Sequence, residues 1–339
     1  MKNQIFVISD EEESKLLSEK CDDSINNILL IGLGASALNT RALMSCVNLT
    51  KKIIFVDSID SDQIDNLISE LNSKNTVITV ISKSGKTDET ILILKYILAG
   101  ELRNCRTYIV SENENSPLVQ EGLSLSTNAI FYKYELSLSG RFSIFLNSSM
   151  LPLHLAGGDI VAIANEARNF SKMQEAINYA DSLLDLYRLG KNIFVISVYD
   201  SKLLGFAEWV RQIVAESLGK DGFGFTTLIS RGTIDEHSQL QLYLDGPDDK
   251  IYYMLPFLDR NVSSSDSKKF LEDAMKNHMK LFNQSIKNSG KPCEFEENFG
   301  VKTICKWLIV IQHIAKCKSL NPFTQPSVDK AKSLYSGIS

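Results

Sequence analysis

Apolar runs and helical spacings alternate along the first half of the chain. Four runs are almost continuously apolar, which is the pattern of buried strands, at 27–33, 53–57, 77–82 and 107–111. Between them, apolar residues recur every three or four positions, which predicts helices over 36–46, 61–71 and 87–99. Apolar strands that alternate with helices predict a parallel sheet that helices cover on both faces.

The second half repeats the alternation with longer helices. Helical spacing covers 142–156, 160–188, 202–218, 264–287, 299–317 and 326–335, and strands are predicted at 192–198, 226–230, 240–246 and 250–257. The stretch 259–269 is rich in Ser, Asp and Lys and resembles a linker. We therefore predict two α/β domains, residues 1–140 and residues 141–339.

Composition and charge narrow the class of protein. The chain of 339 residues has 36 Lys and Arg against 41 Asp and Glu, a net charge of −5, so it lacks the basic excess of a general nucleic-acid binder. Six cysteines without a C-x-x-C pair predict reduced thiols in a cytoplasmic protein, and we recognise no metal-ligand spacing. We expect no signal peptide and no membrane span, because the apolar run 307–314 is short.

Two segments resemble nucleotide-binding motifs. Residues 32–37, GLGASA, fit G-x-G-x-x-A between a strand and a helix, and Asp57 ends the next strand, where a ribose ligand would lie. This leaves an NAD-dependent dehydrogenase open beside a simple tight turn. Residues 84–87, SGKT, resemble the end of a Walker A loop, but Val80 stands where its first Gly is required. A P-loop NTPase is therefore not predicted.

The segment 82–87, SKSGKT, is a candidate phosphate site. It follows a predicted strand and opens a helix, whose N-terminus offers free amide donors and a positive dipole end. Hydroxyl and ammonium donors gather there within six residues, namely Ser82, Lys83, Ser84, Lys86 and Thr87. The alternative is that Ser84 or Thr87 only caps the helix.

Acid–base candidates lie in the second half. Glu208, Gln212 and Glu216 are spaced by four and share one helix face, a pattern that by itself fits a solvated surface equally well. Gly219 ends that helix and leaves Glu216 in its last turn, where a carboxylate can face a cleft. Of the four histidines, His237 is the best candidate, because it follows a Gly-containing turn and precedes a predicted strand.

Six segments, in order, together resemble the glucose-6-phosphate isomerase family. They are IGLGAS (31–36), VISKSGKTDET (80–90), LSGRFS (138–143), RQIVAESLGK (211–220), GTIDEHSQLQL (232–242) and NPFTQPSVDKAK (321–332). Each is weak alone, but the ordered set covers most of the chain and is specific. The resemblance implies an α/β fold of two SIS-type (sugar isomerase) domains, each a mainly parallel sheet flanked by helices in a three-layer sandwich.

The resemblance also implies a reaction. It is the reversible isomerisation of glucose 6-phosphate and fructose 6-phosphate through a cis-enediol, a step of glycolysis and gluconeogenesis. The family's catalytic residues fall on Glu216 as the base, on Arg141 for the enediolate, and on His237 with Lys332 for ring opening. Its substrate-binding residues fall on Gly34, Ser36, Ser82, Lys83, Ser84, Thr87, Gln212 and Gln325. No cofactor and no metal are implied.

The family places its catalytic His in the site of the partner subunit, so the resemblance implies a homodimer that shares His237. The chain departs from the family pattern at Ala35, Lys86, Ser139, Glu236, Thr324 and Ser327. Two further interpretations remain: a dual phosphoglucose/phosphomannose isomerase, and a SIS module that binds sugar phosphates without catalysis. The four catalytic residues argue against the second, whereas the sequence does not separate the first.

Overall fold

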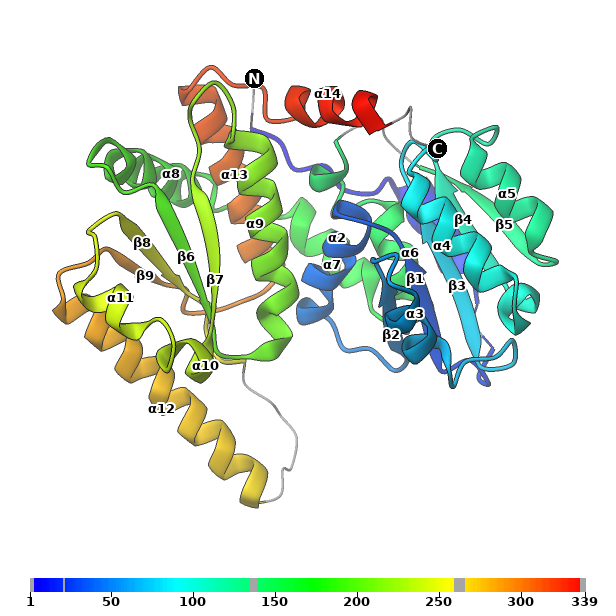
Figure 1. Ribbon diagram of the computed structural model, residues 1–339, viewed down its shortest axis with the longest axis horizontal. Coiled ribbons are helices and arrows are strands. Elements are labelled where there is room, and N and C mark those ends of the chain that lie inside the picture. The colour runs from blue at the N-terminus through cyan, green and yellow to red at the C-terminus, as the bar shows by residue number, and fades with distance from the viewer. Residues whose placement is uncertain (1–2, 21, 135–138, 259–265, 336–339) are drawn as a thin grey trace. The chain divides into compact units, whose positions relative to one another are not determined.

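The computed structural model describes residues 3–20, 22–134, 139–258 and 266–335 of the chain. The chain forms two compact units. The N-terminal unit comprises residues 5–169, and the C-terminal unit comprises residues 170–339 together with residues 1–4. Each unit contains a parallel sheet with helices on both faces (Figure 1), so the predicted three-layer α/β fold is confirmed.

The sheet of the N-terminal unit has five parallel strands in the order β2-β1-β3-β4-β5. The strands are β1 (Asn27–Ile31), β2 (Lys52–Val56), β3 (Thr76–Ile81), β4 (Thr107–Ser111) and β5 (Ala129–Lys133). All residues of β3 are buried, because it lies inside the sheet and helices cover both faces. The strand order reverses between β1 and β3, and sheets of this kind bind ligands beyond the strand ends at such a reversal.

Alternate side chains of the strands face two helical layers. Leu29 and Ile31 join a core with helices α3 (Ser61–Ile68), α4 (Asp88–Leu98) and α5 (Pro117–Leu125). The opposite layer contains α1 (Asp10–Ser18), α2 (Ala35–Leu43), α6 (Asn147–Leu155) and α7 (Ile160–Arg168). Short 3-10 turns span Met44–Cys46, Glu101–Asn104 and Gly140–Phe142. Because α6 packs on β1 and α2, the unit continues to residue 169, past the boundary predicted at 140.

The sheet of the C-terminal unit has four parallel strands in the order β7-β6-β8-β9. They are β6 (Ile193–Val198), β7 (Thr226–Arg231), β8 (Lys250–Met254) and β9 (Cys293–Phe295). One helical layer holds α8 (Met173–Arg188), α9 (Leu204–Leu218, after the 3-10 turn Ser201–Leu203) and α13 (Val301–Cys317). The other holds α10 (Gly232–Glu236), α11 (Leu240–Asp245) and α12 (Asp266–Asn288), and α14 (Pro326–Tyr335) follows α13.

The first described residues are part of the C-terminal unit through one side chain of α13. The backbone N–H of Gln4 donates to Oε1 of Gln312 at 3.0 Å, and Nε2 of Gln312 donates back to the Gln4 carbonyl at 2.8 Å. Gln312 is buried, and its amide also donates to the Leu308 carbonyl. This pairing ties residue 4 to a segment near the other end of the sequence.

The strand predicted at 240–246 is wrong, because residues 240–245 form helix α11. The alternating leucines fit a strand, but Leu240, Tyr243 and Leu244 also fit the spacing of one helix face, and these three pack against the core. Tyr243 is 3% exposed and contacts Tyr252 edge to face, which stabilises the helical choice. The same six residues therefore fit both periods, and packing against the core decides between them.

Other elements follow the predicted ones closely or were not predicted at all. The pattern gave no prediction for α1, α5, β5 and β9, which are short or only partly buried. The single helical stretch predicted at 160–188 is divided into α7 and α8. Part of the predicted linker, 259–265, lies outside the described residues. Among the helices described, none is long and apolar enough to cross a membrane.

Candidate active site

Two loops leave the N-terminal sheet next to each other where the strand order reverses. Gly32 follows β1, and a Cβ there would lie 3.2 Å from the Ile81 carbonyl oxygen at the end of β3. Gly34 has φ 56° and ψ −127°, a conformation that residues with a side chain rarely adopt, and it begins α2. The turn thereby places Ser36 in the first turn of α2, half-buried, beside the end of β3.

The second loop, 82–87, follows β3, and its hydroxyl groups do not cap the helix that comes next. Ser82 Oγ and Thr87 Oγ1 lie 3.1 Å apart. Thr87 is the N-cap residue of α4, yet within the described part of the chain its side chain makes no capping bond. Ser84 accepts a hydrogen bond from the Lys86 N–H at 3.2 Å, one position short of the helix. The loop hydroxyls therefore surround a helix start whose amides they do not cap.

The shape of this loop is fixed by the segment that follows β4. The Glu112 N–H donates to the Lys83 carbonyl at 2.9 Å, and the Leu118 N–H donates to the Gly85 carbonyl at 3.0 Å. Gly85 has φ +63°, and a Cβ on it would meet Ser116 Oγ at 2.1 Å. Only glycine fits there, so the loop is held in one conformation before any ligand binds.

The electrostatics of this edge favour an anion, more at α2 than at α4. The first turn of α2 carries no acidic residue, whereas Asp88 and Glu89 in the first turn of α4 already offset its dipole. Lys83 lies 3.5 Å from Glu112, and Lys86 is exposed. The positive end of the α2 dipole, the loop hydroxyls and the two ammonium groups together suit a phosphate monoester.

Arg141 lies in a 3-10 turn that packs on α2. It is 1% exposed. A Cβ on the preceding Gly140 would lie 3.3 Å from the Ala35 Cβ. Ala35 is one of the positions that depart from the family pattern, and its methyl group therefore faces this turn. Asn39 of α2 donates to the Gly140 carbonyl at 2.9 Å. Sequence reasoning missed Asn39, because a single buried polar residue on a helix gives no signal of what it holds.

Asp57, the residue of the dinucleotide interpretation, has a protein partner. Its carboxylate lies 2.8 Å from Nη2 of Arg41, whose guanidinium stacks 4.2 Å above the Phe55 ring. The pair is partly exposed, at 30% for the arginine side chain and 38% for the aspartate. A ribose would have to compete with this ion pair for the carboxylate.

Glu216 lies in the last turn of α9, beside Gln212. Nε2 of Gln212 donates to Oε1 of Glu216 at 2.9 Å. Oε1 of the same glutamine is buried and has no hydrogen-bond partner in the part of the chain that the structure describes. An unsatisfied buried acceptor beside a carboxylate is costly unless a ligand satisfies it. The two side chains therefore have the character of a polar binding site.

The segment after α13 is tied to the end of α9. Nζ of Lys220 donates to the Ser217 carbonyl at 3.1 Å and also to the Asn321 carbonyl. The Gln325 carbonyl accepts a hydrogen bond from the Val328 N–H, in the first turn of α14, at 3.0 Å. Sequence reasoning assigned Lys220 no role, although it lies in the same segment as Glu216. The side chain of Lys332, on α14, lies outside the described residues.

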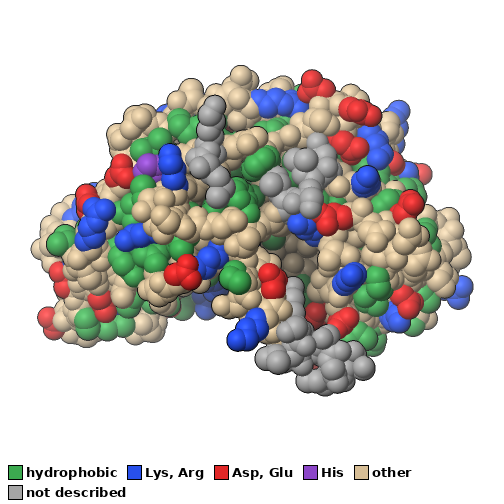
Figure 2. Space-filling model, turned by 90° about the horizontal axis from the view of Figure 1, so that it is seen from above, with side chains coloured by type: hydrophobic (Ala, Val, Ile, Leu, Met, Phe, Trp, Pro, Cys, Tyr) green, Lys and Arg blue, Asp and Glu red, His purple; other side chains and the backbone are tan. Residues whose placement is uncertain are grey.

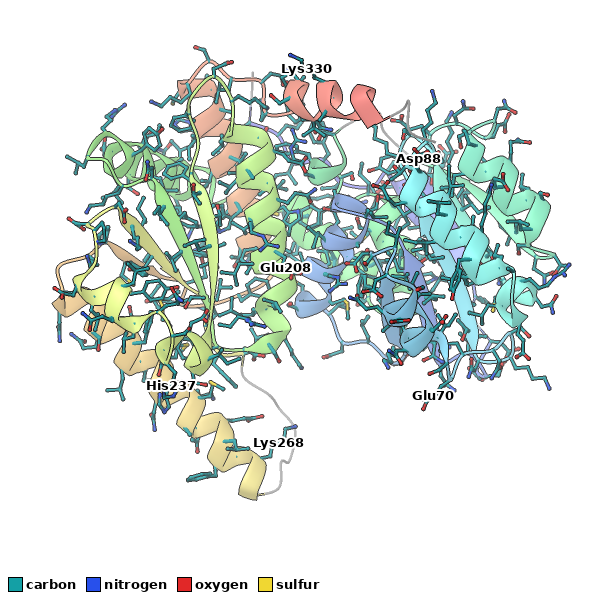
Figure 3. The ribbon with its side chains drawn as sticks, in the orientation of Figure 1. Glu70, Asp88, Glu208, His237, Lys268 and Lys330 are labelled. Carbon is teal, nitrogen blue, oxygen red and sulfur yellow. The ribbon has the colours of Figure 1, made fainter. Side chains whose placement is uncertain are left out.

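His237 lies at the opposite end of the C-terminal sheet. It is the exposed C-cap residue of α10, in the helical turn that leads to α11, and not in a loop before a strand. Helix α9 ends before β7 begins and α10 starts where β7 ends, so the six residues of β7 separate Glu216 from His237. That length is roughly 20 Å. In Figure 3, His237 and Lys330 likewise lie toward opposite ends of this sheet.

Glu236 anchors the short helix that carries His237. Tyr199, at the end of β6, donates its hydroxyl to Oε1 of Glu236, and His278 of α12 lies 2.9 Å from Oε2. Burial and then the hydrogen bond to Glu236 raise the pKa of Tyr199, so its hydroxyl stays a donor. Both carboxylate oxygens of Glu236 thus have a partner, and these contacts hold in place the residue that precedes His237.

Charges on the face seen in Figure 2 are mixed. Lys and Arg side chains alternate with Asp and Glu side chains across this face and do not merge into one broad basic patch. The arrangement on this face agrees with the net charge of −5. Positive charge is instead local, as at the 82–87 loop.

The sequence also matches a known protein family. Residues 4–233 match the family model described as Phosphoglucose isomerase, which is more than half of the chain. The chain belongs to the phosphoglucose isomerase family. The match includes the segments with Gly34, Ser82, Arg141 and Glu216 and ends before His237.

Two archaeal relatives show how far the similarity extends. A probable glucose-6-phosphate isomerase of Methanococcus maripaludis is 31% identical over 280 residues, 77% of this chain and 63% of the relative. A glucose-6-phosphate isomerase of Methanocaldococcus jannaschii is 28% identical over 355 residues, 97% of this chain and 87% of the relative. The chain thus spans less than two thirds of the first protein and most of the second.

Solved structures confirm the fold. A hypothetical protein from Thermus thermophilus matches with a TM-score of 0.76 at 23% identity, over 96% of this chain and 86% of that one. A glucose-6-phosphate isomerase from Chlamydia trachomatis matches with a TM-score of 0.69 at 19% identity, over 97% and 71%. A putative phosphosugar isomerase from Bacillus subtilis has a TM-score of 0.57 at 13% identity, over 94% and 95%. The fold is that of two SIS-type domains.

Proposed function

We propose that the protein interconverts glucose 6-phosphate and fructose 6-phosphate. The family match and the names of the two archaeal relatives support this reaction. The observation that carries it for this chain is the pair Glu216 and Gln212, a carboxylate beside an unsatisfied buried acceptor at the end of α9. A proton-transfer enzyme needs such a base beside groups that orient the sugar.

The phosphate group binds at the N-terminal unit in this proposal. The Ser36 hydroxyl at the positive end of α2, and the 82–87 loop with Ser82, Lys83, Ser84 and Thr87, supply the donors and the positive potential. Gly34 and Gly85 let the backbone adopt the required turns. Because the loop is already fixed, little of the binding energy is lost in ordering it, and the remainder can orient the sugar.

Glu216 moves the proton between C2 and C1. From glucose 6-phosphate in the open-chain form it takes the C2 proton, and the electron pair shifts to form the enediolate. The hydroxyl proton passes from O2 to O1, and Glu216 returns its proton to C1, which gives fructose 6-phosphate, so no atom is gained or lost. The guanidinium of Arg141 stabilises the negative charge on the enediolate oxygen. Gln212 and Gln325 bind sugar hydroxyls, and His237 with Lys332 opens the ring.

The active enzyme is a homodimer in this proposal. Roughly 20 Å of sheet lies between Glu216 and His237 within one chain, so the two cannot act on one small sugar there. His237 of a second copy can supply the missing group, because a two-fold interface delivers the same residue to both sites. We place this dimer in the cytoplasm, which agrees with the free thiols of Cys105, Cys293 and Cys317.

A mixing experiment tests the shared site. Glu216→Gln and His237→Ala are each expected to be inactive. If each site uses one chain's Glu216 and the other's His237, denaturing and refolding an equal mixture should restore about a quarter of wild-type activity, because half of the dimers then carry one intact site. Activity no higher than the average of the two variants would contradict a shared site. Mixing two separately prepared samples of Glu216→Gln is the control.

Turnover of fructose 6-phosphate by the purified protein tests the reaction itself. A coupling dehydrogenase detects glucose 6-phosphate, and no metal is added. Activity with fructose 6-phosphate and none with mannose 6-phosphate supports the proposal as stated, and activity with both indicates the dual isomerase. Saturable binding of fructose 6-phosphate without turnover would favour a non-catalytic SIS module.

A further inference from the structure

Three side chains with different ligand atoms meet on one surface of the C-terminal unit. Asp181 comes from α8, and His313 and Cys317 come from α13. Nε2 of His313 lies 2.9 Å from Oδ1 of Asp181 and 3.5 Å from Sγ of Cys317. All three ligand atoms lie within 4.8 Å of one another, and none belongs to the residues assigned to the isomerase reaction.

The geometry matches a tetrahedral metal site. His313 and Cys317 are one helical turn apart and share a face of α13. Zinc bonds to nitrogen at about 2.0 Å and to sulfur at about 2.3 Å, which places the two ligand atoms roughly 3.5 Å apart at a tetrahedral angle. The observed 3.5 Å needs no adjustment. The Asp181 oxygen has to move a few tenths of an ångström away from the histidine nitrogen and has to come to roughly 3.5 Å from Sγ, from which it lies within 4.8 Å. That side chain is 57% exposed and can turn to do so.

The combination of ligand atoms selects the metal. Calcium and magnesium prefer oxygen ligands, whereas imidazole and thiolate together favour zinc among the abundant divalent ions. An Asp–His ion pair alone would not need a thiol beside the same nitrogen. We propose that Asp181, His313 and Cys317 bind Zn²⁺, with water in the fourth position. The Cys317 thiol releases its proton to solvent as the Zn–S bond forms.

The position of the site suggests what bound zinc does. Cys317 is the last residue of α13, and the chain then turns through Ser319, which has φ 57°. The next residues include Asn321, which accepts the hydrogen bond from Lys220, and Gln325, which directly precedes α14. Zinc bound between α8 and α13 would fix the end of α13, where the segment that carries these residues starts. It would stabilise this unit without taking part in proton transfer.

No sequence pattern indicated this site. His313 and Cys317 are four residues apart, a spacing that is common on helices. Asp181 lies 132 positions before His313. The packing of α8 on α13 alone brings the third ligand into place.

Cobalt spectroscopy on the full-length protein tests the proposal directly. Metal is first removed with a chelator, and Co²⁺ is then titrated. A thiolate-to-cobalt charge-transfer band with intense tetrahedral d–d bands, saturating at one Co²⁺ per chain and abolished by one equivalent of Zn²⁺, supports the site. Absence of the charge-transfer band would overturn it. Asp181→Asn, His313→Ala and Cys317→Ser should each weaken Zn²⁺ binding at least about tenfold, and Cys317→Ser should remove the band.

Matched controls carry the same substitutions elsewhere in the unit. Cys293→Ser removes a thiol that donates a hydrogen bond to Asn283 Oδ1 at 3.2 Å. His278→Ala removes a histidine that, like His313, is paired with a carboxylate, that of Glu236. Both should bind Co²⁺ as the wild type does. Loss of the band in either control with retention in Cys317→Ser would place the metal elsewhere and overturn the assignment.

Alkylation of the wild type provides a test that does not depend on how the variants fold. Iodoacetamide at pH 8 should modify the exposed Cys317, and one equivalent of Zn²⁺ should slow that modification at least about tenfold, as mass spectrometry of the peptides would measure. Burial raises the pKa of both Cys105 and Cys293 to about 11, so these thiols should react slowly with or without the metal. Unprotected Cys317 at saturating Zn²⁺ would contradict the proposal.

Discussion

The two units build their parts of the candidate site in opposite ways. In the N-terminal unit, two loops meet at one strand reversal, and backbone turns at Gly32, Gly34 and Gly85 define the site. In the C-terminal unit, single side chains project from distant ends of the sheet, as Glu216 and His237 do. In the proposed function, phosphate binding is therefore local and preformed in the backbone. The proposed proton transfer instead depends on side chains that tertiary and quaternary structure must bring together.

Removing the base should give the largest effect. Glu216→Gln keeps the shape and the hydrogen bond with Gln212, but cannot accept a proton. We expect kcat to fall by about 10²–10⁴-fold with little change in the affinity for fructose 6-phosphate, measured by a coupled assay and by calorimetry. Glu208→Gln, two turns earlier on the same helix face, is the matched control and should retain most activity. An equal loss in both variants would mean that the face, and not the base, matters.

A methyl group on Gly85 tests whether the phosphate loop is preformed. In Gly85→Ala the new Cβ would lie only 2.1 Å from Ser116 Oγ. The backbone there has φ +63°, which residues with a side chain rarely adopt. We expect the free energy of unfolding to fall by about 2–4 kcal/mol in urea, since both strain and overlap contribute. Gly190→Ala has φ +87° with nothing within 4 Å, so it should cost only about 1 kcal/mol. Equal losses would show that the loop relaxes freely.

The hydroxyl pair at the 82–87 loop should affect substrate binding and not chemistry. Thr87→Val removes the group that lies 3.1 Å from Ser82 Oγ while preserving side-chain volume. We expect KM for fructose 6-phosphate to rise about tenfold at nearly constant kcat, because a hydrogen bond to a charged group contributes about 1.5–3 kcal/mol. Steady-state kinetics would measure both parameters. A fall in kcat at unchanged KM would contradict the assignment of Thr87 to the phosphate.

Lys86 should have the smallest effect. It is exposed, and its charge acts through solvent. We expect Lys86→Met to raise KM only about two- to threefold at low salt, because an exposed ammonium contributes less than about 1 kcal/mol. The difference should disappear at about 0.5 M salt, since screening removes the attraction. A salt-independent effect would indicate a direct and desolvated contact.

Sequence patterns captured the local parts of this molecule best. The loop at 82–87 was predicted because its hydroxyls and lysines are consecutive and follow a buried strand. Four of the five strands of the N-terminal unit were predicted within one or two residues, because apolar runs leave few alternatives. The roles of Glu216, Arg141, His237 and Lys332 came from the family resemblance, since neither periodicity nor spacing assigns a chemical role to one side chain.

What the patterns missed depends on packing between distant segments. Residues 240–245 fit two periods equally, and only Tyr252 and Phe282 select the helix. Asn39 supports the Arg141 turn across 101 positions of sequence. The placement of α6 and α7 on the first sheet extends that unit to residue 169, which no composition change marks. Sequence reasoning therefore fails where a residue acts through a partner that lies far away along the chain.

The hydrogen bonds between Gln4 and Gln312 can form only late in the synthesis of the chain. The two residues are separated by 308 positions, and residue 4 is made first. At about 5–20 residues per second, a ribosome takes roughly 15–60 s to reach the second partner. Residues 5–169 can fold in the meantime, whereas the segment at residue 4 remains unpaired until α13 leaves the exit tunnel. During synthesis the contact between residue 4 and α13 thus forms only after the whole of the first unit has been made.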